Sequence, residues 1–358
     1  MTAIAKKREG KRRGALVKLL PAAIAAALLA FPSLAAAGAA NGLKLCATLV
    51  PALLPLMTVS AWASRVGGFS AGGAAARLTR FFFALPPSAA NALLSGWLCG
   101  YPAGARAAAA EYEAGRLTKA QTERLLTFCV CASPSFAVGA VGVSLFGSAY
   151  AGFCVYAAAV LSCFVIGVAG RIFAKKAPPA SAAAVKKTSG GFAEAVADGA
   201  ESVLVICALT VLFGALLGVA EGTALRGLAE PVRASVKLAL ELTNGCAAAA
   251  DVRGGFLLCA AGAGFGGVCA LCQCAALTRT ERPRLNLLPM LLSRAAHGAL
   301  TAVFASLLLR LDGGAVGVFS AFAEGVRAVP KVENAPAAVV LLMLSATVMM
   351  KAAAKRGA

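Results

Sequence analysis

Long apolar runs dominate the chain, and short segments with polar or charged residues separate them. The eight principal runs are Leu16–Ala40, Leu43–Ala63, Leu125–Phe146, Ser148–Phe173, Ser202–Ala220, Phe256–Leu277, Leu285–Leu309 and Ala335–Met350. Each is long enough, or nearly so, to cross about 30 Å of hydrocarbon as an α-helix. Polar and apolar residues do not alternate at every second position, as they do in the strands of a membrane barrel. The pattern therefore predicts an all-α, polytopic membrane protein with about eight transmembrane helices.

The composition agrees with this class. Hydrophobic residues make up 60% of the 358 residues and charged residues 14%, with a mean hydropathy of +0.81. Soluble domains contain roughly 45–50% apolar and about 25% charged residues. The twelve cysteines lie mainly within the apolar runs, where Cys acts as a small apolar residue, so we expect no disulfide framework. We expect no metal site either, because the cluster of Cys269, Cys272 and Cys274 has no second ligand pair nearby.

Basic residues indicate how the chain is oriented. The net charge is +19, and the Lys and Arg residues gather at the ends of apolar runs, which membrane topology explains better than nucleic-acid binding. The cations between Lys6 and Arg13 precede the first run and place the N-terminus in the cytoplasm. A cleaved signal peptide is the alternative for this segment. The run is long for a signal peptide, and we favour an uncleaved helix.

Two further apolar stretches, 81–104 and 228–250, do not cross the bilayer in the arrangement that the charges favour. If 81–104 crossed completely, the five cations of 171–187 would face the exterior. A re-entrant hairpin broken around 95–102, and a second one interrupted at 243–245, instead place 25 of the 34 Lys and Arg residues inside and eight outside.

With this topology each half of the chain contains a helix, a hairpin, an interrupted helix and a helix, and the two halves run in opposite directions. Such inverted-topology repeats are common in secondary transporters, whose substrate sites lie where the broken elements meet. The predicted organisation is an N-terminal transmembrane helix (1–40), a first repeat (41–175), a cytoplasmic linker (176–192) and a second, inverted repeat (193–350). Both termini are expected in the cytoplasm.

Four interruptions of the apolar pattern are candidates for backbone that lines a cavity, because non-helical backbone at membrane depth is tolerated only there or within packed protein. They are SGWLCGYPAGAR (95–106), CASPSFAVG (131–139), ELTNGC (241–246) and GAGFGG (262–267). The N-termini of the half-helices at such breaks favour anionic ligands. Close helix packing explains GAGFGG at least as well, whereas we favour a binding site at the breaks that contain proline and polar side chains.

Candidate substrate-binding residues come from these breaks and from polar positions inside apolar runs, which are costly in lipid. At the breaks they are Ser95, Gly96, Gly100, Tyr101, Pro102, Ser133, Pro134, Ser135, Glu241, Thr243 and Asn244. Gly100 permits a tight reversal, Pro102 suits the start of a helix, and Ser133 can cap one. The polar residues that complete the set are Arg106, Gln273, Arg294 and His297.

These last four residues have alternative roles. Arg106 either pairs with a carboxylate on the solute or extends to the inner interface. Gln273 requires a buried hydrogen bond. Arg294 and His297 share one helix face, where Arg294 either binds solute or neutralises Glu241. His297 is either a proton relay or a satisfied buried histidine, which is the commoner case.

The sequence carries no enzyme signature: it has no nucleotide-binding loop, no zincin pattern and no serine-centred elbow with a plausible base. His297 is the only histidine. We therefore expect neither catalysis nor a cofactor.

Several segments resemble a known family. They are VPALLPL (50–56), LLSGWLCGYPAGAR (93–106), RLTKAQTERLLTFCVCASPSFAVGAVG (116–142), ELTNGC (241–246), GFGGVCALCQ (264–273) and SRAAHG (293–298). The combination of SG-x-x-x-GYP-x-GA-[KR] with F-x-x-x-x-SP-x-F is similar to the sporulation integral membrane protein YlbJ family, also called stage V sporulation protein V, of the nucleoside-recognition Gate domain group. The resemblance covers about residues 40–350.

The resemblance implies two Gate-like repeats and a carrier of dipicolinic acid, a planar dicarboxylate, across the outer forespore membrane during endospore formation. The expected partners are the lipid bilayer and this small anionic solute, and a coupling ion or a homo-oligomer is compatible with such a carrier. A carrier of nucleosides or other small polar solutes stays open as an alternative. A non-transporting scaffold of the spore envelope also stays open, although the sequence offers no long loops or coiled coils for docking.

Overall fold

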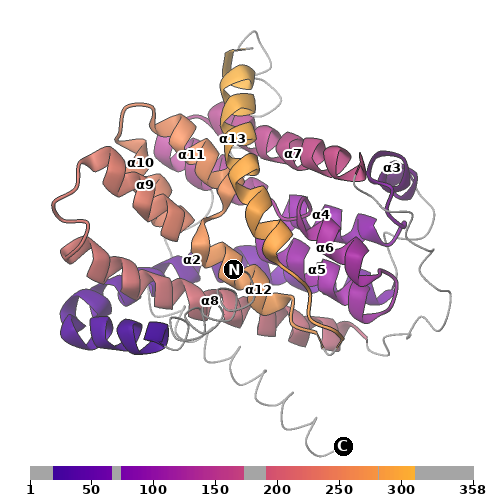
Figure 1. Cartoon of the computed structure of the whole chain (residues 1–358), viewed down its shortest axis with the longest axis horizontal. Coiled ribbons are helices and arrows are strands. Elements are labelled where there is room, and N and C mark those ends of the chain that lie inside the picture. The colour runs from indigo at the N-terminus through magenta and orange to yellow at the C-terminus, as the bar shows by residue number, and fades with distance from the viewer. Residues whose placement is uncertain (1–18, 67–73, 173–190, 281, 311–358) are drawn as a thin grey trace, which may run out of the picture.

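The computed structural model describes residues 19–66, 74–172, 191–280 and 282–310, and Figure 1 shows their arrangement. In the first half the elements are the helix Leu19–Ala30, α2 (Pro32–Val66), α3 (Ala74–Phe83), α4 (Ala89–Cys99), α5 (Tyr101–Glu113), α6 (Lys119–Leu126), the π-helix η1 (Ser135–Leu145) and α7 (Ala149–Ile172). In the second half they are α8 (Phe192–Gly222), α9 (Glu230–Leu240), α10 (Leu242–Ala250), α11 (Gly255–Phe265), α12 (Gly267–Leu277) and α13 (Leu288–Arg310).

The described residues form helices and no strands, which confirms the predicted all-α class. Five segments among them are long and apolar enough to cross a membrane: α2, α7, α8, the pair α11–α12, and α13. These spans support the prediction of a helical membrane protein. The eighth predicted run, the part of the predicted linker over 176–190 and both termini, which the sequence predicts to be cytoplasmic, lie outside the described residues.

The junction predicted between the first two transmembrane helices is wrong. The helix α2 continues through Asn41 and Gly42, and the chain bends instead at Phe31. The boundary placed at residue 40 therefore falls inside a helix. The reason is tertiary packing, because a Cβ at Gly38 would lie 2.2 Å from the backbone oxygen of Gly214. Small residues that let two backbones approach this closely stabilise a helix that local propensity disfavours.

The two longest helices, α2 and α8, pack against each other in opposite directions along the lower part of Figure 1. Near one end Gly38 meets Gly214, and at the other end Arg65 pairs with Asp198. The helices α7 and α13 are also antiparallel, since Tyr150 donates to the Leu308 oxygen while Ser162 contacts His297.

Two helical hairpins lie on opposite sides of the molecule, with α4 and α5 on the right of Figure 1 and α9 and α10 on the left. The two helices of each hairpin pack against each other. In the first hairpin Gly96 and Gly104 face each other. The Cys129 backbone lies against both residues, and a Cβ on either glycine would clash with the Cys129 oxygen. Helices α11 and α12 lie between the hairpins, and α13 crosses in front of them.

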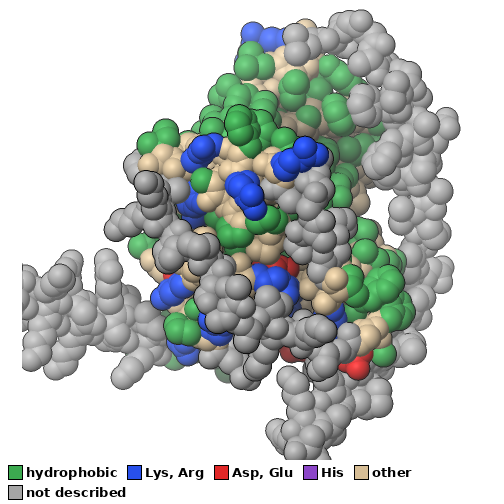
Figure 2. Space-filling view, turned by 90° about the vertical axis from the view of Figure 1, so that its right-hand side faces the viewer, with side chains coloured by type: hydrophobic (Ala, Val, Ile, Leu, Met, Phe, Trp, Pro, Cys, Tyr) green, Lys and Arg blue, Asp and Glu red, His purple; other side chains and the backbone are tan. Residues whose placement is uncertain are grey.

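Lys and Arg side chains gather on the face of the molecule that Figure 2 shows, where the ends of several helices meet. Arg171 donates to the Phe81 oxygen, and Arg124 donates to the Ala84 oxygen at 2.8 Å. Cations from two separate regions of the sequence, which the charge pattern predicts on the same side of the membrane, therefore both reach the C-terminal end of α3.

Candidate functional site

The first hairpin turns at Gly100, within the segment where the sequence predicts the reversal. Gly100 has φ of 102° and ψ of −179°, a backbone conformation that is essentially restricted to glycine. Pro102 lies in the first turn of α5, as predicted, where its missing N–H leaves no hydrogen bond unmade. The turn is therefore fixed by local sequence chemistry.

The first interrupted helix breaks between α6 and η1. The apolar run Leu125–Phe146 is consequently not one helix, because residues 130–133 are non-helical and η1 starts after them. The Ser133 hydroxyl accepts a hydrogen bond from the Phe136 amide at 3.3 Å, which confirms the predicted cap. The part of this interrupted helix that follows the break, η1, is a π-helix of 11 residues. Short stretches of this rare helix type are frequent at functional sites.

The second hairpin breaks at Glu241, slightly earlier than the predicted Thr243-Asn244-Gly245. Glu241 is extended, with φ of −141° and ψ of 120°, and α10 begins directly after it. Its carboxylate accepts hydrogen bonds from the Thr243 amide at 3.0 Å and from the Asn244 amide and Nδ2, both at 2.8 Å. Thr243 and Asn244 are therefore helical because Glu241 caps them.

The second interrupted helix breaks at two consecutive glycines. Gly266 and Gly267 have φ of 95° and 74°, and they separate α11 from α12. Packing accounts for part of this break, since a Cβ at Gly266 would lie 3.1 Å from the Tyr101 ring. The tip of the first hairpin thus contacts the break in the other half of the chain.

All four breaks meet at one cavity of about 100 Å³. It is lined by Leu49, Leu53, Cys99, Gly100, Tyr101, Pro102, Ala132, Ser133, Phe136, Ile206, Thr210, Glu241, Leu242, Thr243, Gly266, Cys269, Ala270 and Gln273. Seven predicted site residues are among them: Gly100, Tyr101, Pro102, Ser133, Glu241, Thr243 and Gln273. The four breaks therefore contribute residues to the wall of one cavity, and the substrate-binding role of these residues stays a prediction.

The cavity is surrounded by helix N-termini. The helices α5, η1, α10 and α12 all begin at residues that line it or directly follow lining residues. The first-turn amides of a helix lack intrahelical acceptors and carry partial positive charge. Of the four helices, α10 is capped by the Glu241 carboxylate, whereas α5 and α12 start after glycines and receive no side-chain cap.

Polar side chains complete the wall. Gln273 is 7% exposed, and its Nε2 donates to Thr210 Oγ1 at 3.3 Å and to the Ile206 oxygen at 3.4 Å. These contacts satisfy the predicted need for a buried hydrogen bond and use the amide nitrogen. Glu241 is the one charged side chain among the lining residues.

The other predicted residues from the breaks lie outside the cavity wall. Ser95 Oγ contacts Ser60 Oγ at 2.7 Å, and Gly96 packs within the hairpin. Pro134 and Ser135 follow the lining residue Ser133, and Asn244 is held by Glu241. Arg106 also lies outside, and its Nη1 is 3.7 Å from the Glu113 carboxylate.

Arg294 and His297 lie behind the cavity wall. Arg294 is fully buried and donates to backbone carbonyls, and among the described residues it forms no ion pair with Glu241. The interpretation that Arg294 neutralises Glu241 is therefore wrong. His297 Nε2 lies 2.7 Å from the Thr127 oxygen, and Nδ1 lies 3.1 Å from Ser162 Oγ.

Sequence reasoning missed Thr210, which lies in the middle of the long apolar helix α8. The signal was present, because Thr210 is a polar residue inside an apolar run, as Gln273 is. The apolar lining residues, such as Phe136 and Ile206, carry no comparable signal. They differ from the surrounding core residues only in their position.

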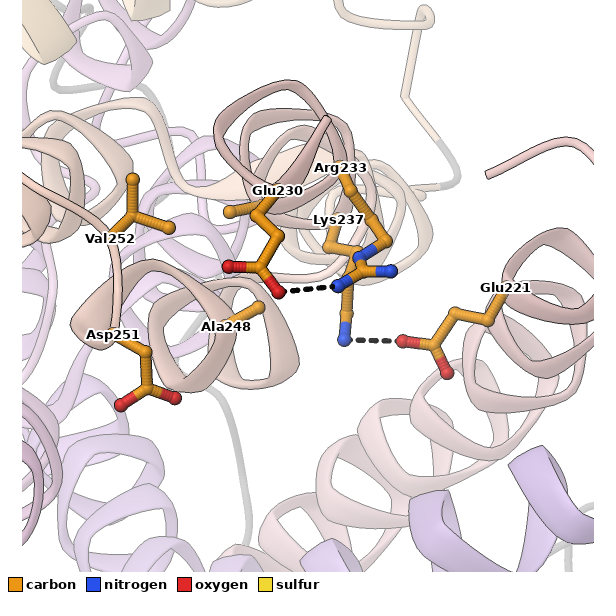
Figure 3. Close-up of a pocket in the computed structure, with 8 residues that line it drawn as sticks. Glu221, Glu230, Arg233, Lys237, Ala248, Asp251 and Val252 are labelled. Atoms are coloured by element: carbon orange, nitrogen blue, oxygen red, sulfur yellow. Dashed lines mark hydrogen bonds and ion pairs between the residues drawn. The ribbon is translucent and has the colours of Figure 1, made fainter. Parts of the chain in front are cut away.

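A second pocket of about 300 Å³ lies at the ends of α8, α9 and α10. Its charged side chains form pairs, since Arg233 contacts Glu230 at 3.3 Å and Lys237 contacts Glu221. Figure 3 shows both pairs, with Asp251 lying apart from them. Both cations are therefore neutralised by carboxylates, and Asp251 leaves the lining with a net charge of −1, which does not favour an anion.

All twelve cysteines are free thiols, and all except Cys272 are buried. This agrees with their predicted role as small apolar residues.

Comparison of the chain with family models, with curated proteins and with solved structures finds no match.

Proposed function

We propose that the protein is a membrane carrier for a small anionic solute, with two inverted-topology repeats that enclose the solute between their broken elements. The observation that carries the proposal is the meeting of two hairpin tips and two helix breaks at one cavity. Sites of this kind, lined by the N-termini of discontinuous helices, bind anionic groups in secondary transporters.

The order and direction of the elements support the repeat. The series from α2 to α7 contains a long helix, a hairpin, an interrupted helix and a closing helix, and the series from α8 to α13 has the same order. The first elements of the two series, α2 and α8, are antiparallel, and so are the last, α7 and α13. Inverted repeats require this relation between corresponding helices.

The electrostatics favour an anion or a solute rich in acceptors. Each helix N-terminus is equivalent to roughly half a positive charge, so four of them amount to about two charges. Glu241 compensates about one of these. The remaining positive potential lies mainly at α5 and α12, whose first turns have no side-chain cap.

Dipicolinate is the particular solute that we propose, on the basis of the resemblance to the sporulation integral membrane protein YlbJ family. Its carboxylates suit the free amides at α5 and α12. The cavity of about 100 Å³ is smaller than the roughly 300–1,000 Å³ of typical ligand pockets. The hairpins must therefore separate to admit a planar dicarboxylate.

Uptake of labelled dipicolinate into proteoliposomes tests the proposal. We expect uptake above that of protein-free liposomes, and we expect Gln273→Met to reduce it because the change removes a polar group from the wall. Arg106→Ala is the matched control and should transport normally, since Arg106 lies outside the cavity. The absence of uptake by the wild-type protein in either direction of the gradient would count against an anion carrier. Competition by nucleosides but not by dicarboxylates would select the nucleoside alternative.

A further inference from the structure

Arg294 is a fully buried cation that binds backbone carbonyls rather than a carboxylate. Its Nη2 donates to the Thr127 oxygen at 3.0 Å, and its Nη1 donates to the Val130 oxygen at 3.1 Å and the Gly264 oxygen at 3.5 Å. A buried charge without compensation is strongly destabilising. The three carbonyls are therefore the groups that make this position tolerable for an arginine.

The carbonyls that Arg294 binds belong to both interrupted helices. Thr127 is the C-terminal cap residue of α6, and Val130 follows in the non-helical segment of the same break. Gly264 lies in the last turn of α11, directly before the second break. The last carbonyls of a helix have no intrahelical donors and carry partial negative charge. One guanidinium thus serves the C-terminal ends of two half-helices that are far apart in the sequence.

His297, one turn further along α13, adds to the same contact. Its Nε2 lies 2.7 Å from the Thr127 oxygen, and because a carbonyl only accepts, Nε2 must carry the proton. Its Nδ1 contacts Ser162 Oγ on α7 at 3.1 Å. Ser293, also on α13, donates to the same Thr127 oxygen at 3.2 Å. Helix α13 therefore holds the end of α6 through three side chains and links it to α7.

The two sides of each break have opposite polarity. The carbonyl ends of α6 and α11 meet Arg294, while the amide ends of η1 and α12 meet the cavity. We propose that Arg294 is a positioning residue that couples the two interrupted helices, so that both amide ends stay directed at the cavity. The coupling itself follows from the contacts of Arg294, and its consequence for solute binding rests on the proposed function.

Hydrogen–deuterium exchange of Arg294→Met in nanodiscs tests the coupling without any ligand. We expect the segments 127–137 and 262–272 to exchange about tenfold faster together, because hydrogen bonds to a charged donor are lost at both breaks. Arg106→Met is the matched control and should leave both segments unchanged. A change in only one segment, or in neither, would overturn the proposal. Faster exchange throughout α2 and α8 as well would show a general loss of stability and would also overturn it.

Arg294→Lys keeps the inference testable if the Met variant does not fold. Lysine retains the charge but offers one nitrogen in place of two, so both segments should exchange faster than in the wild type and in Arg106→Met. If Lys affects one break alone, the coupling is refuted.

Measuring the Kd of dipicolinate for the same nanodisc samples distinguishes a failure of this inference from a failure of the proposed function. We expect Arg294→Lys to raise the Kd about tenfold while its melting temperature stays close to that of Arg106→Met. If the wild type binds no dipicolinate but both segments respond to the substitution, the proposed function fails and the coupling stands. If dipicolinate binds the wild type and Arg294→Lys with equal affinity, the positioning role for the solute is refuted.

Discussion

Replacing Glu241 with Gln tests the sign of the charge that the cavity accepts. The change removes the one carboxylate in the cavity wall, keeps the shape of the side chain, and retains one acceptor oxygen, which can serve the Thr243 or the Asn244 amide but not both positions. If the solute is an anion, the negative charge of Glu241 opposes its binding. We therefore expect Glu241→Gln to bind dipicolinate more tightly than the wild type does.

The size of this effect follows from the size of the cavity. A space of about 100 Å³ places a bound anion about 6 Å from a carboxylate in its wall, and at an effective dielectric constant of about 20 two unit charges at that separation interact by about 3 kcal/mol. Solvent that enters the open state weakens this interaction, so we expect a gain of about 1–2 kcal/mol, or about tenfold in Kd. The weaker helix cap costs about 1 kcal/mol of stability and lowers the melting temperature.

Isothermal titration calorimetry of the protein in nanodiscs at low ionic strength measures the Kd of dipicolinate directly. Glu113→Gln is the matched control, because Glu113 pairs with Arg106 outside the cavity, and its Kd should equal that of the wild type. Weaker binding by Glu241→Gln, with the control unchanged and the variant still folded, would refute the reasoning. Glu241 would then attract the solute or a coupling cation, and the cavity would not be an anion site.

Two further predictions concern glycines. Gly100→Ala should lower the free energy of unfolding by about 1–3 kcal/mol through backbone strain, and it should weaken solute binding. Gly254 is also at positive φ but has open space around it, so Gly254→Ala should lower only the melting temperature. Gly214→Val should lower the melting temperature strongly, because the new Cβ would lie 2.6 Å from the backbone of α2 and overpacking costs about 1–3 kcal/mol or more. Gly170 has no atom near its Cβ position, so Gly170→Val should melt as the wild type does.

The breaks could be predicted from the sequence because their causes are local. A glycine that permits positive φ, a proline at a helix start and a serine cap act within a few residues, and Gly100, Pro102 and Ser133 occupy these roles in the structure. The all-helical class was predictable for a similar reason, since the length and composition of the apolar runs determine it.

The errors arise where tertiary contacts decide. The Asn-Gly pair at 41–42 suggests a turn, but the backbone of α8 lies against Gly42 and keeps α2 helical. The sequence left two roles open for Arg106, at the solute or at the inner interface, and the structure places it beside Glu113, about two turns further along α5, and outside the cavity wall. No sequence pattern shows that Arg294 reaches two breaks, because its acceptors are backbone carbonyls, which carry no residue identity.

The polarity of the broken helices explains why so few charged side chains suffice for this site. Every break inside a bilayer exposes one amide end and one carbonyl end, and each needs a partner of opposite charge or a hydrogen-bonding group. The chain supplies Arg294 for the carbonyl ends and Glu241 for the amide end of α10. At α5 and α12 it supplies glycine, which offers no cap. The first-turn amides of these two helices therefore have no side-chain acceptor, and this is the basis on which we propose an anionic solute for the cavity.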